Sequence, residues 1–384
     1  MKKIVFISHQ ADRTGAPIVL LHLLRWLKQS NKFELLIILQ EGGELEQEFH
    51  DIAETHVWSP PASTNVWQYR WERVVQRSKK YQQQVARRVK TFAPDAIYGN
   101  TIVTAPLGIE LKQLVNCPFI CHVHELSVVI DEFFGKEKFT EFSKHINFFI
   151  AASEAVATNL QENHQVSAEL INTVHEVVPE LDSVAFDAAR QQIRHQLGIA
   201  DDTFVVAGAG SIDWRKAPDL FIQVAQHIKA LNASRIVFIW VGGKLSSNDG
   251  RKVRHDASKA GVAQLVHFLG AQSNPYDYLN AADLFLLTSR EDPYPLVCLE
   301  AASLGKPVVC FADSGGMPEF VEQDCGIVVP YLRTDLMAQA VLTISESDDL
   351  QRKFGANAAK KMRERHTIEL AGQAISEVIR RITG

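Results

Sequence analysis

The sequence lacks any apolar run long enough to cross a membrane, which takes about 18 consecutive apolar residues. The N-terminus, MKKIVFISHQ, carries two lysines and then an apolar run of about five residues, well short of the core of a secretion signal, and no small-residue cleavage site follows. The sequence therefore predicts a cytoplasmic protein without a membrane-spanning helix.

Cysteine is scarce and unpatterned. The five cysteines are odd in number and show no C-x-x-C spacing. This pattern argues against a disulfide framework and a thiolate metal site, and it is typical of reduced core residues in a cytoplasmic protein. The five are Cys117, Cys121, Cys298, Cys310 and Cys325.

A large excess of charge of one sign is also missing. The chain has 40 Lys and Arg against 45 Asp and Glu, a formal net charge of −5. The protein as a whole therefore gives no case for a nucleic-acid partner. One segment departs from this balance, because residues 70–90 contain eight Lys or Arg and one acid, Glu72.

The basic segment has a helical pattern. Its apolar residues fall along one helical stripe, namely Trp71, Val75, Tyr81, Val85 and Val89. Two interpretations stay open. Either the stripe packs on a sheet beneath a solvated basic face, or the segment Trp67–Lys90, with Trp67, Tyr69 and Trp71 at one end, contacts an anionic membrane or an anionic acceptor. The second interpretation places the protein peripherally at the inner face of the membrane.

Apolar runs alternate with helix-like stretches along the whole chain. The first set comprises KKIVFIS at 2–8, followed by a helical pattern opening at Gly15, and then runs at 33–39, 95–99, 118–123 and 147–153. After a weak point near residues 177–202, a second set lies at 203–210, 235–243, 265–270, 283–289 and 306–312. The alternation predicts an α/β protein with two doubly wound Rossmann-like domains and a cleft between them.

The same pattern suggests domain boundaries. We expect an N-terminal Rossmann-like domain over 1–178 and a C-terminal one over 179–364. A last helix over 365–384 is expected to return to the N-terminal domain. Ligands of such sheets bind at the carboxyl ends of strands, near helix N-termini.

Residues 289–307, SREDPYPLVCLEAASLGKP, are the richest in chemistry. An apolar run ends there at a polar turn, and Pro295 suits the first turn of a helix. The amides of Leu296 and Val297 then lie at a helix N-terminus, where unpaired N–H groups and the helix dipole favour a phosphate. Asp292 precedes the helix and Glu300 lies inside it, so the two carboxylates can grip hydroxyl groups on either side of a pyrophosphate. The plainer interpretation makes them ordinary acids near a helix start.

A second turn, at residues 210–221, carries two adjacent cations, Arg215 and Lys216. Cations at a helix N-terminus oppose the helix dipole, which disfavours a purely solvated role for them.

These segments resemble glycosyltransferase family 4, which has the GT-B fold. The spacing Asp292-x7-Glu300 matches the family's E-x7-E donor motif, with Asp in place of the first Glu and Glu291 beside it. Residues 313–319, DSGGMPE, resemble the family's Gly-Gly-x-Pro-Glu loop, and residues 326–330 resemble the segment after it. Gly315 and Gly316 would let backbone amides approach the diphosphate or the sugar.

The turn that begins at Gly210 resembles the family's cationic turn, where an arginine and a lysine neutralise the negative charge that develops on the departing nucleoside diphosphate. Lys216 matches the family's lysine, whereas Ser211 stands where the family has an arginine. Either Arg215 supplies that second charge or one cation is missing. Ala217 replaces the usual glycine.

Two N-terminal segments resemble the family more weakly. Gly15-Ala16-Pro17 follows the first apolar run and resembles the Gly-rich loop that faces the donor phosphate. His124, in HVHE, matches the position of the family's histidine near the sugar.

The resemblance implies a retaining, metal-independent hexosyltransferase without a cofactor, active in polysaccharide biosynthesis. It implies a UDP- or GDP-sugar donor in the C-terminal domain and a glycan or lipid-linked glycan acceptor in the N-terminal domain. Catalytic roles fall on His124, Asp292, Lys216 and Arg215. Donor-binding roles fall on Gly15, Gly210, Ser211, Glu291, Leu296, Val297, Glu300, Gly315 and Gly316.

Two other classes of function stay open. Ser211, Asp292 and Ala217 depart from the family pattern, which leaves a catalytically silent GT-B binding protein as an alternative. Gly208-Ala-Gly210 hints at a dinucleotide-dependent oxidoreductase, but Asp213 stands where the third glycine of G-x-G-x-x-G belongs.

Overall fold

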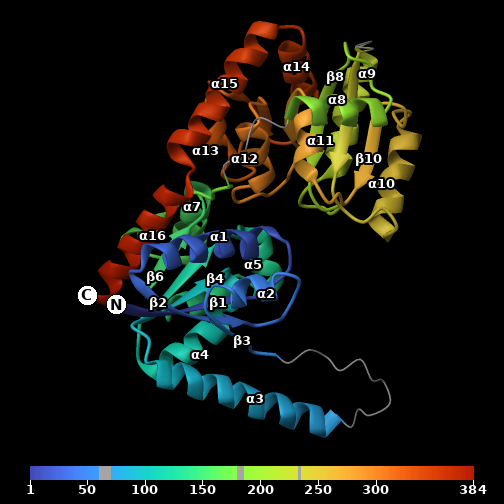
Figure 1. Cartoon of the computed structure of the whole chain (residues 1–384). Coiled ribbons are helices and arrows are strands. Elements are labelled where there is room, and N and C mark those ends of the chain that lie inside the picture. Colours follow the sequence, from blue (N-terminus) through green and yellow to red (C-terminus); the bar gives the residue numbers. More distant parts are fainter. Residues whose placement is uncertain (60–70, 180–185, 232–234) are drawn as a thin grey trace. The chain divides into compact units, whose positions relative to one another are not determined.

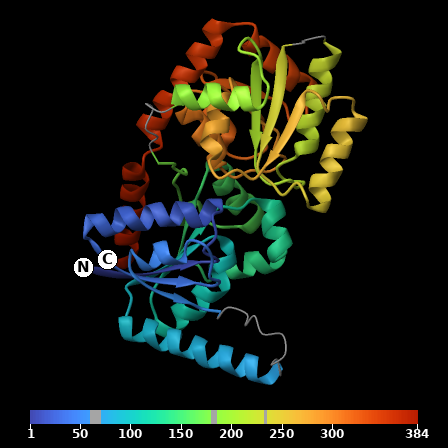
Figure 2. The same ribbon diagram turned by 45° about the vertical axis from the view of Figure 1, so that its right-hand side comes forward.

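The computed structural model describes residues 1–59, 71–179, 186–231 and 235–384. They form two compact units, one of residues 1–177 with 368–384 and one of residues 178–367. Each unit is a parallel sheet with helices on both faces (Figures 1 and 2). The predicted fold class, two doubly wound α/β domains, is confirmed.

The sheet of the first unit has seven strands in the order β3-β2-β1-β4-β5-β6-β7, and all neighbours are parallel. Its central strands are apolar runs buried along nearly their whole length, as a sheet covered on both faces requires. The strands are β1 (Lys2–Ser8), β2 (Phe33–Leu39), β3 (Glu54–Val57), β4 (Ala96–Asn100), β5 (Phe119–Val123), β6 (Phe148–Ala151) and β7 (Ile171–Thr173).

Helices from both ends of the chain cover one face of this sheet: α1 (Gly15–Ser30), α2 (Glu46–His50) and α16 (Ile368–Thr383). Gly372 lets α16 approach α1 closely, because a Cβ on Gly372 would lie 2.4 Å from Cε3 of Trp26. The other face is covered by α3 (Trp71–Phe92), α4 (Ala105–Val115), α5 (Ser127–Phe133), α6 (Lys136–Ser143) and α7 (Glu154–His164). Figure 1 shows α1 and α16 on one side of the sheet and α3 and α4 on the other.

The sheet of the second unit has six strands in the order β10-β9-β8-β11-β12-β13, again parallel throughout. The strands are β8 (Phe204–Ala209), β9 (Ile236–Val241), β10 (Val266–Gly270), β11 (Leu284–Leu287), β12 (Val308–Phe311) and β13 (Gly326–Val329).

Two helical layers enclose the second sheet. One face packs against α9 (Pro218–Ala230), α10 (Asn248–Lys259) and α14 (Thr334–Ser345). The other face packs against α11 (Pro275–Ala281), α12 (Leu296–Ser303), α13 (Met317–Val321) and α15 (Asp348–Arg365), and α8 (Phe186–Gln196) packs on α11.

Both sheets have a switch point, where the strand order reverses direction. In the first unit it lies between β1 and β4, and in the second between β8 and β11. The loops that leave two such strands run to opposite faces of the sheet and open a crevice at the carboxyl edge, which is where ligands of doubly wound sheets bind. The segments that carry the predicted chemistry, residues 210–217 and 289–295, follow β8 and β11.

Candidate functional site

The loop that follows β8 carries the two cations. The backbone turns at Gly210 (φ 142°) before α9 begins at Pro218. A Cβ on Gly210 would lie 3.0 Å from side-chain carbons of Lys216. Glycine therefore lets the lysine stem pass close to the strand end. The Asp213 carboxylate accepts a hydrogen bond from the backbone N–H of Lys216 at 2.8 Å and so fixes the turn.

The loop that follows β11 carries the acid that meets these cations. Nζ of Lys216 lies 2.6 Å from Oδ2 of Asp292, and Nη1 of Arg215 lies 3.2 Å from Oδ1. The Ser289 hydroxyl donates a hydrogen bond to Oδ2 at 2.9 Å. The Asp292 carboxylate is thus buried between two cations and a hydroxyl group.

The cations decide the charge state of Asp292. Burial by itself would raise the pKa of Asp292, but the attraction of Lys216 and Arg215 and the hydrogen bonds from Lys216 and Ser289 outweigh it, so the pKa falls below 3.8. Asp292 is therefore ionised at neutral pH. Two cations therefore contact one carboxylate at the switch point of the second sheet.

The glycine loop before α13 is tied to the acidic loop. The backbone N–H of Asp292 donates to the carbonyl of Ser314 at 2.7 Å, and a parallel β-bridge joins Asp292 to Gly315. The N–H of Gly316 donates to the carbonyl of Pro293 at 2.9 Å. Gly315 has φ 132°, a backbone conformation that side chains with a Cβ rarely adopt. The glycine loop predicted from the sequence therefore lies against the acidic loop.

Helix α12 begins at Leu296, with Pro295 as its N-cap in an extended conformation. The prediction that Pro295 lies in the first helical turn is wrong by one residue, because the backbone becomes helical only after it. Leu296 and Val297 form the first turn, where backbone N–H groups have no carbonyl of their own helix to bind. These amides lie a few residues after Asp292 in the same loop.

Glu300 lies inside α12 and has a partner that the sequence did not indicate. The Tyr276 hydroxyl, from the start of α11, donates a hydrogen bond to Oε1 of Glu300 at 3.2 Å. Burial raises the pKa of Glu300, and the hydrogen bond from Tyr276 opposes that rise. Burial, together with the charge of Glu300, also raises the pKa of Tyr276, which therefore stays a hydrogen-bond donor.

Two further predicted residues, Glu291 and Ser211, lie beside the contacts of Asp292 with Lys216 and Arg215. Glu291 is buried, and its backbone carbonyl accepts a hydrogen bond from Nη1 of Arg215 at 3.3 Å. The carboxylate that contacts both cations is that of Asp292. Ser211 is exposed, and its hydroxyl donates to the Asp213 carboxylate. Arg215 thus shares one carboxylate with Lys216, while Ser211, at the family's arginine position, supports the turn.

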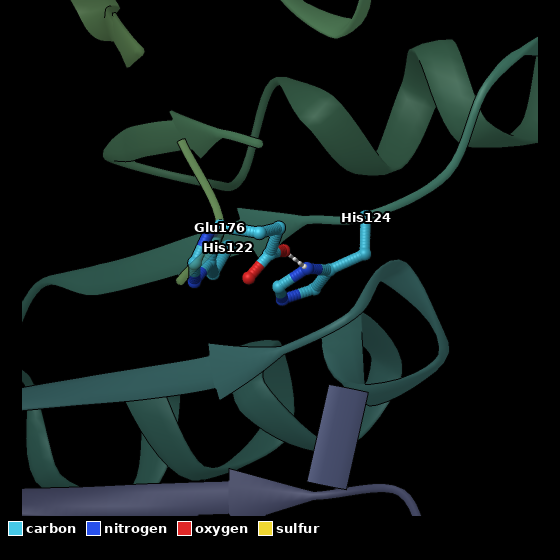
Figure 3. Close-up of side chains that lie close together, drawn as sticks. All are labelled: His122, His124 and Glu176. Atoms are coloured by element: carbon cyan, nitrogen blue, oxygen red, sulfur yellow. Dashed lines mark hydrogen bonds and ion pairs between the residues drawn. The ribbon is translucent and has the colours of Figure 1, made fainter. Parts of the chain in front are cut away.

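In the first unit, His124 follows β5 and is held by both ring nitrogens. Its Nδ1 pairs with Oε1 of Glu176 (Figure 3). Its Nε2 lies 2.9 Å from Oδ1 of Asn100. Asn100 ends β4, and its Nδ2 donates to the carbonyl of Ala16 at 2.9 Å. Ala16 follows Gly15, which opens α1. His124 and the Gly15 loop are therefore joined through one asparagine at the switch point of the first sheet.

His122 lies beside this pair at the end of β5. The Tyr98 hydroxyl is 2.6 Å from its Nδ1. Burial, with a smaller contribution from His124, holds the pKa of His122 well below its usual range, so the ring is neutral. Among the described residues, His122, His124 and Glu176 form a group with ligand atoms within 4.8 Å of one another, a set that zinc accepts. Both ring nitrogens of His124 already have hydrogen-bond partners, so the group also holds together as a hydrogen-bonded pair without a metal.

The structure thus gathers the predicted site residues into two groups, one in each unit. Gly15 and His124 lie in the first unit. The second unit holds Gly210, Ser211, Arg215, Lys216, Glu291, Asp292, Leu296, Val297, Glu300, Gly315 and Gly316. The sequence analysis missed Asn100, Glu176 and Tyr276, each of which fixes a predicted residue.

Family profiles match two consecutive segments of the chain. Residues 13–179 match the profile described as Glycosyltransferase Family 4. Residues 189–361 match the profile described as Glycosyl transferases group 1. The chain belongs to glycosyltransferase family 4.

Two curated relatives illustrate the similarity in sequence. The D-inositol 3-phosphate glycosyltransferase of Streptomyces bingchenggensis is 29% identical over 239 residues, 60% of this chain and 51% of the relative. The enzyme of the same name from Corynebacterium glutamicum is 26% identical over 286 residues, 70% of this chain and 68% of the relative. The chain therefore spans about half to two thirds of the length of these relatives.

Solved structures share the fold over nearly the whole chain. HepE of Anabaena, in complex with UDP-glucose, is similar with a TM-score of 0.81 at 22% identity, covering 99% of this chain and 100% of HepE. Sucrose-phosphate synthase of Thermosynechococcus elongatus is similar with a TM-score of 0.79 at 17% identity, covering 99% of each chain. The family-4 glycosyltransferase therefore has the GT-B fold.

Residues 71–90 of the basic segment belong to α3, and the side chains of residues 71–78 lie outside the described part of the structure. The apolar residues Val85 and Val89 are buried against the first sheet. Among the side chains that the structure describes, four basic ones are exposed: Lys79, Lys80, Arg87 and Lys90. Trp67 and Tyr69 lie outside the described residues. In the part of the chain that the structure describes, no helix combines the length and the apolar character that crossing a bilayer requires.

Proposed function

We propose that this glycosyltransferase moves a hexosyl group from a nucleoside-diphosphate sugar, a UDP- or GDP-sugar, to an acceptor hydroxyl, with retention of anomeric configuration. The observation that carries the proposal is the contact of Lys216 and Arg215 with Asp292 at the switch point of the second sheet. Two cations beside a loop that leads into the N-terminus of α12 suit a diphosphate.

Lys216, Arg215 and the first turn of α12 form the proposed diphosphate site. Leu296 and Val297 are the first two residues of α12, so their N–H groups lie at the helix N-terminus, where the helix dipole favours an anion. Gly315 and Gly316 let a second loop come close to the same acid. Gly210 and Ser211 shape the turn that carries the cations.

The proposed reaction breaks the bond between the anomeric carbon and the β-phosphate oxygen. A bond from the acceptor oxygen forms on the same face of the sugar, and the acceptor's proton ends on the departing diphosphate. Negative charge grows on the diphosphate oxygens, and Lys216 and Arg215 stabilise it from fixed positions. We propose that these two cations serve in place of a metal ion, so that the reaction needs no cofactor.

The carboxylates are proposed to hold hydroxyl groups of the donor. Glu300, held by Tyr276, binds the ribose, and Asp292 or Glu291 binds the sugar. Asp292 is the stronger candidate, since its carboxylate touches both proposed diphosphate-binding cations. From the first unit, His124 is proposed to contact the sugar and the Gly15 loop the donor phosphate.

The donor base and the acceptor are proposed from chemistry that relatives suggest. HepE was solved with UDP and with UDP-glucose, so UDP-glucose is the first donor to test. The acceptor is proposed to be a glycan or lipid-linked glycan of polysaccharide biosynthesis, with the exposed basic residues of α3 contacting an anionic membrane surface. The names of the curated relatives make inositol 3-phosphate the first small acceptor to test.

We place the reaction in the cytoplasm, at the inner face of the membrane. All five cysteines are unpaired and buried, which suits a reducing compartment. Fractionation of cells that express the protein, with and without a high-salt wash, tests this location.

A donor screen tests the proposal. A ligand that binds the folded state raises the melting temperature in proportion to its occupancy. Release of UDP or GDP from each stabilising donor is then measured with glycan, lipid-linked and inositol phosphate acceptors. Donor binding without release under any combination would favour a catalytically silent binding protein.

A further inference from the structure

The ring of His124 has a complete set of hydrogen-bond partners, and their chemistry assigns its protons. The carbonyl of Ala16 can only accept, so the amide atom of Asn100 that faces it, 2.9 Å away, is the NH2 group. The other amide atom of Asn100, its carbonyl oxygen, therefore faces Nε2 of His124 at 2.9 Å. An oxygen acceptor requires an N–H donor, so Nε2 carries a proton.

The second ring nitrogen is held by a carboxyl group. Nδ1 of His124 is hydrogen-bonded to Oε1 of Glu176, a contact that is also an ion pair when the ring is protonated, and the two side chains are 10% and 5% exposed. Figure 3 shows the Glu176 carboxyl group directed at the imidazole edge. Whether the shared proton sits on Nδ1 or on Glu176, Nε2 keeps its own proton. Neither nitrogen then offers a lone pair to an incoming hydroxyl.

The groups around His124 favour the protonated, positively charged form of its ring. Burial alone would lower the pKa of His124, but the attraction of Glu176, the hydrogen bond to it and the more distant charge of Glu125 raise the pKa above 6.5. His122 and His9 are further titratable groups near the ring, and burial lowers the pKa of each, so both are neutral. The Glu125 carboxylate is itself occupied by the backbone N–H groups of His124 and Ile102.

Glu176 lies in the segment that leads from the first unit to the second. Glu176 lies three residues beyond β7 and immediately before Val177, the last residue of the first unit before the chain enters the second. A small cavity beside it is lined by the linker, by α1 and by the start of α16, where the chain returns to the first unit. The partner of His124 is therefore supplied by a segment through which the chain passes between units.

We infer that Glu176 is a positioning residue for His124, and that the Glu176–His124–Asn100 chain makes His124 a hydrogen-bond donor to a substrate oxygen, through Nε2–H, rather than a general base. This inference rests on the proposed function for its catalytic meaning. Without substrate, Nε2–H donates its hydrogen bond to Oδ1 of Asn100. When a sugar or phosphate oxygen approaches, Nε2–H donates to that oxygen instead. Glu176 fixes the ring edge-on and balances its charge.

The experiment compares the wild type with Glu176→Gln, and Glu125→Gln serves as the matched control. Glutamine keeps the size of each side chain and removes its charge, but only Glu176 touches the ring. Selective ¹⁵N labelling of histidine, with His124→Asn to assign the signal, follows the protonation of both ring nitrogens across pH without any substrate. Thermal unfolding of each variant checks that it is folded.

We expect Nδ1 of His124 to lose its proton in Glu176→Gln at a pH about one unit or more below that of the wild type, the size of shift that a contacting carboxylate produces. Glu125→Gln should cause a smaller shift. The positively charged ring is a stronger hydrogen-bond donor than the neutral ring, so kcat/KM should fall on the alkaline side of its pH profile, and Glu176→Gln should move that fall to lower pH. Glu176→Asp should restore it in part, which a purely structural role would not predict.

Three results would overturn the inference. One is a His124 titration that Glu176→Gln leaves unchanged. Another is activity that rises as His124 loses its proton, the behaviour of a general base. The third is stoichiometric binding of Zn²⁺ to the wild type that is lost in both Glu176→Gln and His122→Ala, which would make the group a metal site. The histidine titration is measured without donor, so it stands even if no sugar transfer is found.

Discussion

Lys216 and Asp292 form a buried ion pair of 2.6 Å across the switch point of the second sheet. The lysine comes from the loop after β8 and the aspartate from the loop after β11, two strands that are neighbours in the sheet. The pair joins the two motifs that point to a donor diphosphate. Its behaviour under substitution is therefore the most direct measure of how this site works.

Replacing Lys216 with Met should lower the rate of transfer by about 10²–10³-fold, as the loss of one preorganised group that stabilises transition-state charge does elsewhere. Methionine keeps the length of the stem beside Gly210 but removes the charge. Steady-state kinetics with the stabilising donor measures the effect. The matched control is Lys252→Met, which removes an exposed lysine paired with Asp249 in the same unit. An equal loss in both variants would contradict a specific role for Lys216.

The charge of Asp292 also predicts a pH effect on stability. Its pKa is lowered in the folded state, so the unfolded chain binds a proton more readily than the folded chain does. Stability from this group is complete above the ordinary value of 3.8 and is lost as the pH falls through the lower folded pKa. Urea unfolding of the wild type and Asp292→Asn at a series of acidic pH values measures the slope. The asparagine variant should show less loss on acidification, and parallel curves would contradict the assignment.

Glu300 should discriminate between nucleotides by their ribose. If its carboxylate binds ribose hydroxyl groups, the wild type should bind UDP more tightly than 2′,3′-dideoxy-UDP, and Glu300→Ala should bind the two nearly equally. Calorimetric titration of each nucleotide measures the four affinities. Discrimination that survives in Glu300→Ala would remove Glu300 from the ribose site.

Tyr276 should act through Glu300. Tyr276→Phe removes the hydrogen bond and keeps the ring, so the affinity for UDP should fall by a net of about 0.5–1.5 kcal/mol, or about 2- to 10-fold. The double variant with Glu300→Ala should be little worse than Glu300→Ala alone, because the tyrosine then has no carboxylate to hold. Additive losses in this double-mutant cycle would show that the two residues act independently.

The exposed basic residues of α3 should govern attachment to anionic membranes. We expect the wild type to float with vesicles of phosphatidylserine and phosphatidylcholine at low salt, and to be released as salt screens the charges. The quadruple variant Lys79→Gln, Lys80→Gln, Arg87→Gln, Lys90→Gln should stay unbound. A control with four exposed lysines of the second unit replaced, Lys252, Lys259, Lys353 and Lys360, should still float. Failure of the wild type to float would remove the membrane contact.

Much of the architecture follows from the sequence because buried parallel strands are continuous apolar runs. The run at 33–39 coincides with β2, and KKIVFIS with β1. Three strands escaped prediction: β3, β7 and β13, of three or four residues each. All residues of β7 are only partly buried, since it lies at the edge of the sheet, so it lacks an apolar run.

The motifs of the second unit were also readable, because each lies on a short continuous segment. One departure from the family pattern, Ala217 in place of glycine, lies at a position with left-handed backbone geometry. It is the N-cap of α9 with φ 54°, a left-handed conformation that glycine adopts without strain. The chain keeps that conformation with alanine in the position where the family usually has glycine.

The partners of the predicted residues were not readable from sequence. Glu176 is 52 residues from His124, and Tyr276 is 24 residues from Glu300. Strand order brings each pair together: β7 lies two strands from β5, and the linker after it returns to the end of β5. The available signal was weak, a lone acid just beyond a short apolar stretch and a tyrosine near a helix start.

The most direct test of the central claim is nucleoside-diphosphate release by the full chain, measured with UDP-glucose and other UDP- and GDP-sugars against the acceptor panel. The account predicts release with at least one donor–acceptor pair, a large loss of release in Lys216→Met, and no such loss in Lys252→Met. Donor binding without release from the wild type, or release that Lys216→Met leaves intact, would contradict it.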